Sequence, residues 1–463
     1  MNNYSSTIYV SVISITAAIG GFLFGFDTAV ISGALSSLIQ FFHLEGSPSL
    51  QGWLVSSIIL GSVVGAAGSG WLADRFGRKA ALGIGAVLFV ISAAASAFAS
   101  SFTIFILSRL LGGLAVGIAA MVAPLFISEI SPPHIRGRLV SMYQFAVTLG
   151  VLVAYFSNNL LRQTQEYLSD LFSVPTTEIW RLMLGSELIP SVLFLALLFF
   201  VPESPRFLVM LNKKEKAGNI LEKISGPVIA QKEMKEITLA LASEGGSVSE
   251  MFAPGLRKAS FIAIFLAVVS QFSGIDIVLH YGPLILERAG FSFGDSLHGQ
   301  IIFGVVLVVF TMLAMWKVDA LGRRKLLFIG NVGIFLSLLA IGWFFYYSSS
   351  SQGLIIAISV FIASFAFSLG PIPWIIMAEI FPTRIRGRAM AVATLALFGA
   401  NWLIAQLFPY LAATIGEHGT FWLLAVLTLP TFWFVWKVLP ETKGRTLEEL
   451  ESSWAEETTS LVK

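Results

Sequence analysis

The sequence predicts an all-α membrane protein of twelve transmembrane helices, built as two pseudo-symmetric six-helix bundles with a cytoplasmic helical loop domain. Three observations predict this fold: the composition, the number of long apolar runs and an internal repeat. Hydrophobic residues make up 56% of the 463 residues and charged residues only 12%, whereas soluble domains carry about 25% charged residues. A soluble fold cannot hide so much apolar surface, so we expect the excess to face lipid.

The apolar runs supply the count of spans. Runs of about 20 apolar residues are long enough to cross a bilayer as helices. They lie near 8–33, 52–72, 80–99, 102–124, 139–160, 181–201, 259–286, 299–318, 326–347, 353–378, 388–412 and 420–438. Glycine and proline residues predict breaks in the first, seventh and tenth spans. The runs divide the chain into an N-terminal bundle (1–201), a linker (202–258), a C-terminal bundle (259–438) and a tail (439–463).

The basic residues predict the orientation. Of the 29 Lys and Arg residues, all but four fall in the tail, in segments that join even-numbered to odd-numbered spans, or at the span ends beside these; the exceptions are Arg109, Arg162, Arg181 and Arg288. The positive-inside rule therefore places both termini and the linker in the cytoplasm, with the chain as a multi-pass protein of the cell (inner) membrane. The first residues lack a basic n-region, so we expect the first span to remain in the protein.

The linker 202–258 is the largest polar segment. Its sequences LNKKEKAGNILEKI and VIAQKEMKEITLALAS have the periodicity and the Lys/Glu content of solvated amphipathic helices. Gly226 and Pro227 separate them. The segment is interpreted as a small helical bundle beneath the membrane domain, with a docking site for a partner protein as the alternative.

The two halves repeat each other. DRFGRK at 74–79 returns as DALGRRK at 319–325, SEISPPHIRGR at 128–138 as AEIFPTRIRGR at 378–388, and VPESPR at 201–206 loosely as LPETKGR at 439–445. Every copy lies at a predicted cytoplasmic helix end, where Arg can bind carboxylates bidentately. We predict two gating networks that form and break during transport, although topology-setting charge alone would also explain some members. Their members are Arg75, Arg78, Glu129, Arg136 and Glu203 in the first, and Arg323, Arg324, Glu379, Arg386 and Glu441 in the second.

These motifs resemble those of the sugar porter family in the major facilitator superfamily. GFLFGFDTAVISGA at 21–34, SRLLGGLAVG at 108–117, GPIPW at 370–374 and PETKG at 440–444 complete the set. The family includes bacterial proton-coupled sugar symporters and animal facilitative glucose transporters, and the resemblance covers almost the full chain. It implies two bundles around a central cavity, alternating access and a carbohydrate-like substrate.

Two charged residues fall inside predicted spans in the outer half of the membrane. Asp27 lies past the middle of the first span and Arg109 in the fourth, and intramembrane charges mark functional sites by default. The resemblance implies that they match the coupling carboxylate of proton symporters and its Arg. We predict that Asp27 exchanges a proton with the cavity under the control of Arg109. The alternative is a purely structural buried pair.

Amide and indole side chains suit a polyol, because they pair with hydroxyls and offer a flat face. The resemblance implies substrate contacts at Gln144, Gln271, Trp374 and Asn401. For the amides the alternative is bonding between helices. The seventh span departs from the family pattern, because Ser270, Asp276 and His280 stand where Gln, Asn and Tyr are usual. Leu397 and Phe398 also replace a usual polar–Trp pair.

Asp276 and His280 are four residues apart and share one helical face. Such a pair can add a protonation site near neutral pH or favour a solute bearing an amine. A self-satisfied polar pair is the other interpretation.

No phosphate loop, metalloprotease motif or hydrolase elbow is present, so the sequence does not favour an enzyme. We expect no cofactor, metal site or nucleic-acid partner, since Cys is absent and the five His residues are scattered. The partners expected are a sugar or polyol, protons and lipid, and the chain is expected to be monomeric. The predicted function is proton symport of a monosaccharide or polyol. The alternatives are a facilitative sugar uniporter, a non-transporting sugar sensor and a proton symporter for an amine-bearing or other non-sugar solute.

Overall fold

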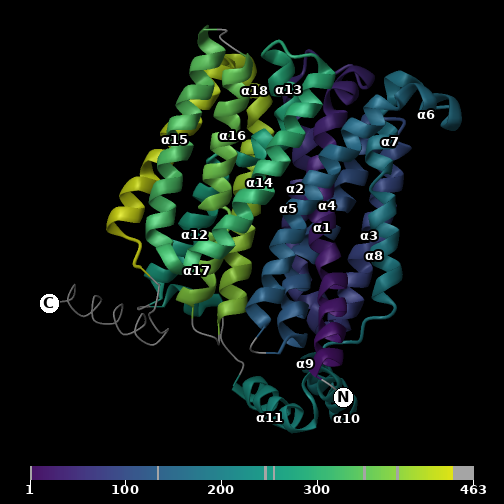
Figure 1. Cartoon of the computed structure of the whole chain (residues 1–463), viewed down its shortest axis with the longest axis vertical. Helices are drawn as coiled ribbons and strands as arrows, with labels where there is room; N and C mark the ends of the chain where they lie inside the picture. The colour runs from purple at the N-terminus through teal and green to yellow at the C-terminus, as the bar shows by residue number, and fades with distance from the viewer. Residues whose placement is uncertain are drawn as a thin grey trace. The chain divides into compact units, whose positions relative to one another are not determined.

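The structure is a computed structural model that describes residues 3–132, 135–243, 248–253, 256–347, 351–381 and 385–441. It forms two compact units, which are described separately. Unit 1 comprises residues 1–38 and 57–244, and unit 2 comprises residues 39–56 and 245–463. Within the described ranges the regular structure is entirely helical (Figure 1).

The helices of the first half include eight α-helices up to the end of the sixth predicted span. They are α1 (Asn3–Phe41), α2 (Pro48–Phe76), α3 (Arg78–Ala97), α4 (Phe102–Ile130), α5 (Arg136–Gln163), α6 (Gln165–Phe172), α7 (Trp180–Gly185) and α8 (Leu188–Leu198), with a 3₁₀ turn at Thr176–Glu178. Three helices of the linker follow, namely α9 (Pro205–Met210), α10 (Lys214–Ser225) and α11 (Pro227–Ser243).

The second half continues with a 3₁₀ turn at Val248–Phe252 and seven α-helices. They are α12 (Arg257–Phe272), α13 (Ile275–Arg288), α14 (Phe293–Leu321), α15 (Arg323–Tyr347), α16 (Ser351–Phe367), α17 (Ile372–Ile380) and α18 (Arg386–Lys437). Of the predicted tail, only residues 439–441 fall within the described ranges.

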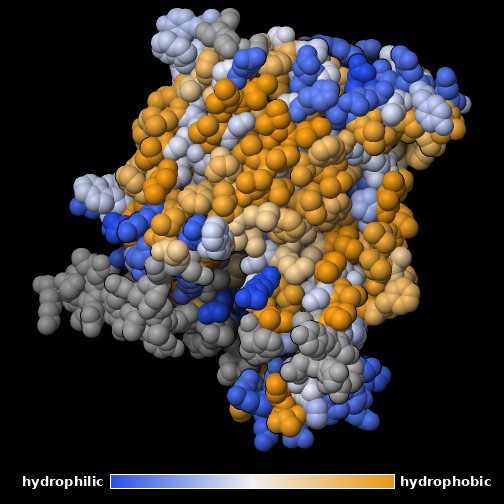
Figure 2. Space-filling view, viewed as in Figure 1, coloured by the Kyte–Doolittle hydropathy of each residue, from blue (hydrophilic) through white to orange (hydrophobic). Residues whose placement is uncertain are grey.

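The helical segments confirm the predicted membrane fold. In the described part of the chain, eleven are long and apolar enough to span a bilayer. The last, α18, has 52 residues and a non-helical Gly416 with φ 74°. At 1.5 Å per residue it is far longer than a bilayer core of about 30 Å, so it holds both the eleventh and the twelfth predicted spans. Large apolar side chains such as Trp71 of α2 (61% exposed) and Trp316 of α14 (72%) cover the outer faces of the helices (Figure 2), so the chain is a multi-pass membrane protein.

Two of the three predicted breaks are confirmed. The seventh span divides into α12 and α13 at Gly274, which has φ 87°, and the tenth divides into α16 and α17 around Pro371. The predicted break in the first span is wrong, because α1 runs without interruption from Asn3 to Phe41. The glycines of α1 serve close packing instead: a Cβ on Gly25 would collide with the main chain of Val147 in α5. Such small residues let two membrane helices approach each other.

The linker is helical, as predicted. Leu208 and Val209 of α9 pack with Ala217 of α10, and apolar residues of α10 and α11 cover them: Ile220, Met234, Ile237 and Leu241. In Figure 1 these three helices lie beyond the ends of the spanning helices of unit 1. The segment therefore has its own small core, which favours the helical-bundle interpretation.

Two prolines inside helices of unit 2 each free a main-chain carbonyl, and a side chain of a neighbouring helix donates a hydrogen bond to that carbonyl. Proline has no N–H, so it leaves the carbonyl four residues earlier without a donor. Pro409 in α18 frees the carbonyl of Ala405, and the hydroxyl of Tyr281 in α13 donates to it at 2.9 Å. Pro283 in α13 frees the carbonyl of Leu279, which accepts from the Gln300 amide at 3.5 Å. The outer part of α13 is thus tied to α18 through a polar bond in an apolar setting.

We expect Tyr281→Phe to lower the free energy of unfolding by about 1–3 kcal/mol, because it leaves the buried Ala405 carbonyl without a donor. Thermal unfolding of the purified protein in detergent measures the change. Tyr410→Phe is the matched control, because Tyr410 lies in α18 five residues after Ala405 and is 52% exposed. Equal stability of the two variants would contradict the bracing role of the Tyr281 hydroxyl.

Residues 39–56, which join α1 to α2, belong to unit 2. The hydroxyl of Ser56 donates to the Gln406 side chain at 2.6 Å, and the Gln406 amide donates to the Ser49 carbonyl at 2.9 Å. Gly52 leaves room for this contact, since its Cβ would lie 2.6 Å from the Gln406 carbonyl. Gln406 therefore fastens the beginning of α2 to α18, next to the kink that Tyr281 braces.

Candidate functional site

The centre of unit 1 contains a buried ion pair. Asp27 on α1 and Arg109 on α4 are 0% and 1% exposed, and the Arg109 guanidinium donates to both the carboxylate and the main-chain carbonyl of Asp27. The helical geometry of α1 and α4 brings together two residues that are 82 positions apart. Burying either charge alone would be very costly, so each depends on the other.

A third charged residue, Glu187, joins this pair. It is 1% exposed, lies in the short break between α7 and α8, and its carboxyl is within hydrogen-bonding reach of Asp27 and close to Arg109. The Asp27 Oδ2 and Glu187 Oε1 atoms are buried and have no hydrogen-bond donor. Two ionised carboxylates and one guanidinium would leave a net charge of −1 at this buried site.

Glu187 is absent from the predicted site, although a clear sequence signal exists for it. It lies inside the predicted span 181–201, so the rule that singles out Asp27 applies to it equally. Gly185 and Pro190 are the sequence signal for the break of this sixth span at residues 186–187, because Pro190 has no N–H to donate to the Ser186 carbonyl.

Gly112 on α4 provides the space beside the carboxylate of Asp27. A Cβ at this position would lie 3.0 Å from Asp27 Oδ2 and 2.5 Å from Ser92 Oγ, and Ser92 itself donates to the Ser108 carbonyl at 2.8 Å. The glycine therefore lets α4 pack closely against Asp27 and against Ser92 of α3.

In unit 2 the predicted amide residues are buried with unused acceptors. Gln271 is 6% exposed and donates to Ser270 Oγ at 3.2 Å, whereas its Oε1 atom has no donor; Asn401 is 8% exposed and its Oδ1 atom also has none. Ser270, which replaces a usual Gln, thus orients the Gln271 amide. Buried acceptors without donors are costly unless a ligand supplies the hydrogen bonds.

Three of the predicted substrate residues lie next to the helix breaks of unit 2. Gln271 stands three residues before Gly274, Asp276 is in the first turn of α13, and the half-buried Trp374 is in the first turn of α17. Interrupted helices are where membrane transporters place binding groups, because the broken turn exposes polar backbone. Gln144 lies in unit 1, half-buried on α5 beside the buried Tyr143.

The structure does not form the side-chain pair predicted between Asp276 and His280. His280 is 1% exposed, and its Nδ1 atom bonds to the main-chain carbonyl of Asp276 at 2.6 Å rather than to the carboxylate. The carboxylate of Asp276 is half-buried at the N-terminal turn of α13, where the helix dipole favours negative charge. The two side chains are therefore separate features of the site.

The first predicted charge network is largely present where α3 begins and α4 ends. Arg78 binds Glu129 through two bonds, Nε to Oε2 at 3.0 Å and Nη2 to Oε1 at 3.1 Å. The carboxylate of Glu203 accepts the N–H groups of Arg78, Lys79 and Ser204 at 2.8–3.1 Å. Gly77, with φ 100°, makes this approach possible, since a Cβ there would collide with Glu203. Burial raises the pKa of Glu203, and the three N–H bonds oppose that rise.

The second network repeats this geometry in unit 2. Arg323 binds Glu379 at 2.8 Å, and Glu441 accepts the N–H groups of Arg323 and Arg324 at 3.0 and 3.1 Å. Gly322, with φ 85°, occupies the position of Gly77 in the repeat, and its Cβ would lie 2.8 Å from Glu441. The side chain of Asp319 lies outside the part of the structure that is described.

Three predicted members bond elsewhere. Arg75 is exposed in the last turn of α2, and its guanidinium stacks over the rings of Trp71 and Phe76. Arg136 begins α5 and acts electrostatically on Glu233 of α11. Arg386 donates to the Phe381 carbonyl at 3.2 Å, as a side chain in the first turn of α18 can. Arg324 also contacts the end of α18, through the Val435 carbonyl at 2.8 Å.

No group of three or more metal-ligating side chains occurs within the described residues.

Comparison with known proteins identifies the family. The family model described as "Sugar (and other) transporter" matches residues 13–454. The chain belongs to this sugar transporter family. Among curated relatives of the family, the chain is 42% identical over 448 residues to the arabinose-proton symporter of Bacillus subtilis, covering 96% of this chain and 95% of the relative. It is 38% identical over 490 residues to the D-xylose-proton symporter of Escherichia coli, covering 99% and 98%.

Solved structures agree with the family assignment. The partially occluded inward-open xylose transporter XylE of E. coli superimposes with a TM-score of 0.84 at 36% identity, covering 95% of this chain and all of the other. The proton:xylose symporter XylE bound to 6-bromo-6-deoxy-D-glucose superimposes with a TM-score of 0.80 over 97% of this chain. The predicted major facilitator fold is thereby confirmed.

Proposed function

We propose that this chain takes up a monosaccharide or sugar-like polyol together with a proton, by alternating access. It resides in the cell (inner) membrane with both termini in the cytoplasm, and it moves its solute without chemical change. The observation that carries the proposal is the buried cluster of Asp27, Arg109 and Glu187, which has one carboxylate more than its guanidinium can balance. The names of the relatives support the cargo, since they are proton symporters of arabinose and xylose.

The roles of the individual residues follow from their surroundings. Asp27 carries the transported proton, Arg109 stabilises the ionised carboxylate, and Glu187 shares the proton with Asp27. The solute contacts Gln144, Gln271, Trp374 and Asn401. The two charge networks close and open the cytoplasmic side of the protein. Asp276 and His280 adjust the choice of solute.

Uptake into proteoliposomes tests the proposal. Radiolabelled pentoses, hexoses, cyclitols and amino sugars are offered with an inward-directed proton gradient, and we expect accumulation above equilibrium that a protonophore abolishes. Equilibration without accumulation would instead indicate a uniporter. Competition by amino sugars alone would favour the amine-bearing solute, for which the half-buried carboxylate of Asp276 is the supporting observation.

Gln271→Ala is expected to raise the KM for the transported sugar about 2- to 13-fold, the equivalent of one lost neutral hydrogen bond, with less effect on the maximal rate. Initial rates over a range of sugar concentrations measure it. Gln352→Ala, at an exposed position of α16, is the control. An unchanged KM in Gln271→Ala would favour the alternative that this amide only joins helices.

A further inference from the structure

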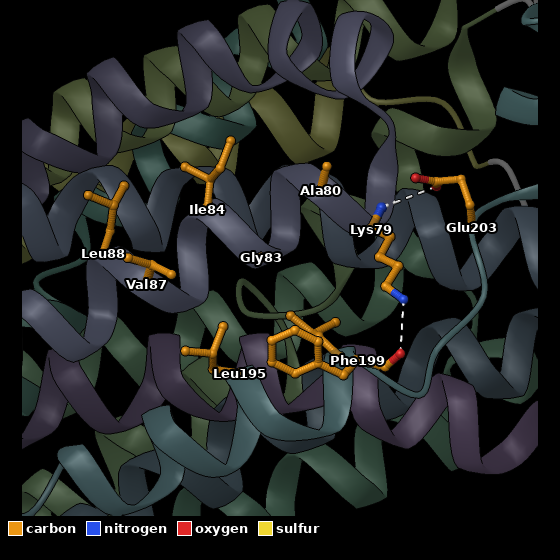
Figure 3. Close-up of a pocket in the computed structure, with 10 residues that line it drawn as sticks. Lys79, Ala80, Gly83, Ile84, Val87, Leu88, Leu195, Phe199 and Glu203 are labelled. Atoms are coloured by element: carbon orange, nitrogen blue, oxygen red, sulfur yellow. Dashed lines mark hydrogen bonds between the residues drawn. The ribbon is translucent and has the colours of Figure 1, made fainter.

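An apolar groove lies on the surface of unit 1. It has a volume of about 550 Å³ and is bounded by α3 and α8 (Figure 3). Its walls are almost wholly apolar, and they are formed by Ala80, Gly83, Ile84, Val87, Leu88, Leu195, Leu198 and Phe199. Gly83 forms an open part of the floor, because a Cβ there would meet nothing within 4 Å.

The groove opens toward the surface that faces lipid. Ile84, Val87 and Phe199 are 40%, 43% and 74% exposed, so its rim is continuous with the apolar outer face of the helices. Along α3 it extends from Lys79 to Leu88, which is about 14 Å at 1.5 Å per residue. That is close to half of a hydrocarbon core of about 30 Å, the depth of one leaflet.

One end of the groove is polar and carries an oriented cation. The Lys79 ammonium donates to the Phe199 carbonyl at the end of α8, at 3.0 Å, and two further N–H donors remain on it (Figure 3). Glu203 stands at the same end, but its carboxylate accepts main-chain N–H groups at the beginning of α3. The dipole of α3 therefore compensates the charge of Glu203, whereas the charge of Lys79 faces the mouth of the groove.

We propose that this groove binds an anionic phospholipid of the leaflet nearest to Lys79. One acyl chain lies in the groove, and the phosphate lies at Lys79. An apolar channel one leaflet deep fits an acyl chain, and a cation at the headgroup level fits a phosphodiester. The neighbour of Lys79 is Arg78, which holds Glu129. Lipid bound at Lys79 therefore adjoins the charge network of unit 1, and the inference does not depend on the identity of the transported solute.

Retention of lipid by the purified full-length protein tests the site. Detergent-purified protein is incubated with phosphatidylglycerol or phosphatidylcholine, and the bound lipid is counted by native mass spectrometry. We expect Lys79→Gln to lower phosphatidylglycerol retention about fivefold and to leave phosphatidylcholine unchanged. Gly83→Leu, which fills the groove, is expected to lower retention of both lipids. Ala80→Leu is a second filling variant, and thermal unfolding verifies that each variant is folded.

Two controls isolate the groove from the general surface. Lys317→Gln removes a cation that stacks on Trp316 of α14, and Gly70→Leu fills open space on α2; neither position lines the groove, so both should retain phosphatidylglycerol like the unaltered protein. Unchanged retention in folded Gly83→Leu and Ala80→Leu would overturn the acyl-chain site. Loss in Lys317→Gln equal to that in Lys79→Gln would overturn the assignment of the headgroup to Lys79.

Discussion

Asp27→Asn is expected to abolish proton-driven accumulation of the sugar while sugar exchange across the membrane continues. Asn preserves the size of the side chain and can still accept a hydrogen bond from Arg109, but it cannot take up a proton. A gradient of one pH unit stores about 1.4 kcal/mol per proton, enough for about tenfold accumulation if one proton moves with each sugar. The accumulation ratio in proteoliposomes should therefore fall from as much as about tenfold to one.

The control is Asp170→Asn, at an exposed position of α6, which should accumulate sugar like the unaltered protein. Counterflow with preloaded sugar verifies that Asp27→Asn still moves its substrate. Retained accumulation in Asp27→Asn together with its loss in Glu187→Gln would transfer the coupling role to Glu187, because the two carboxyls lie within reach of each other.

Arg109→Met should be the most destabilising of these substitutions. It removes the cation from a site in which Asp27 is 0% and Glu187 1% exposed, and so leaves two buried acidic groups without a counter-charge. Removing one partner of a buried pair costs about 3–5 kcal/mol. Thermal unfolding in detergent measures the loss, and Arg138→Met, at an exposed position in the first turn of α5, should have little effect.

The double variant Asp27→Asn/Arg109→Met separates charge balance from packing. If the cost of Arg109→Met comes from the unbalanced carboxylate, the double variant should unfold at a higher temperature than Arg109→Met alone, with an interaction energy of about 0.5–3 kcal/mol. A double variant no more stable than Arg109→Met would show that the guanidinium contributes by filling space between α1 and α4.

The length of the apolar runs was sufficient to predict the spanning helices, because a helix needs about 20 apolar residues to cross the lipid. The breaks within the spans were harder to predict. The break predicted in the seventh span was confirmed, and it lies at Gly274, whose φ of 87° suits glycine. The break predicted in the first span was wrong, because glycines there such as Gly25 allow close helix packing instead. Only the neighbouring helix distinguishes these two uses of glycine.

For the candidate site, local sequence identified side chains but not all of their partners. Asp27 and Arg109 stand out as charges within apolar spans, and the structure brings them into contact. The side-chain pairing of Asp276 with His280 was predicted from their spacing alone, yet the His280 ring bonds to the main chain. In a kinked half-helix a main-chain carbonyl competes for the ring, and spacing does not reveal that competitor.

The sequence alone determined the membrane class, the span count, the duplicated charge motifs and the family resemblance, because each depends on residue type and order along one helix. Tertiary structure decided which distant groups share one environment. It placed Glu187 beside Asp27 and Lys79 at the end of an apolar groove. It also brought the Tyr281 hydroxyl to the Ala405 carbonyl, which Pro409 leaves without a main-chain donor. Such contacts depend on how helices far apart in the chain rotate and approach each other, and a pattern read along a single helix carries no information about that rotation.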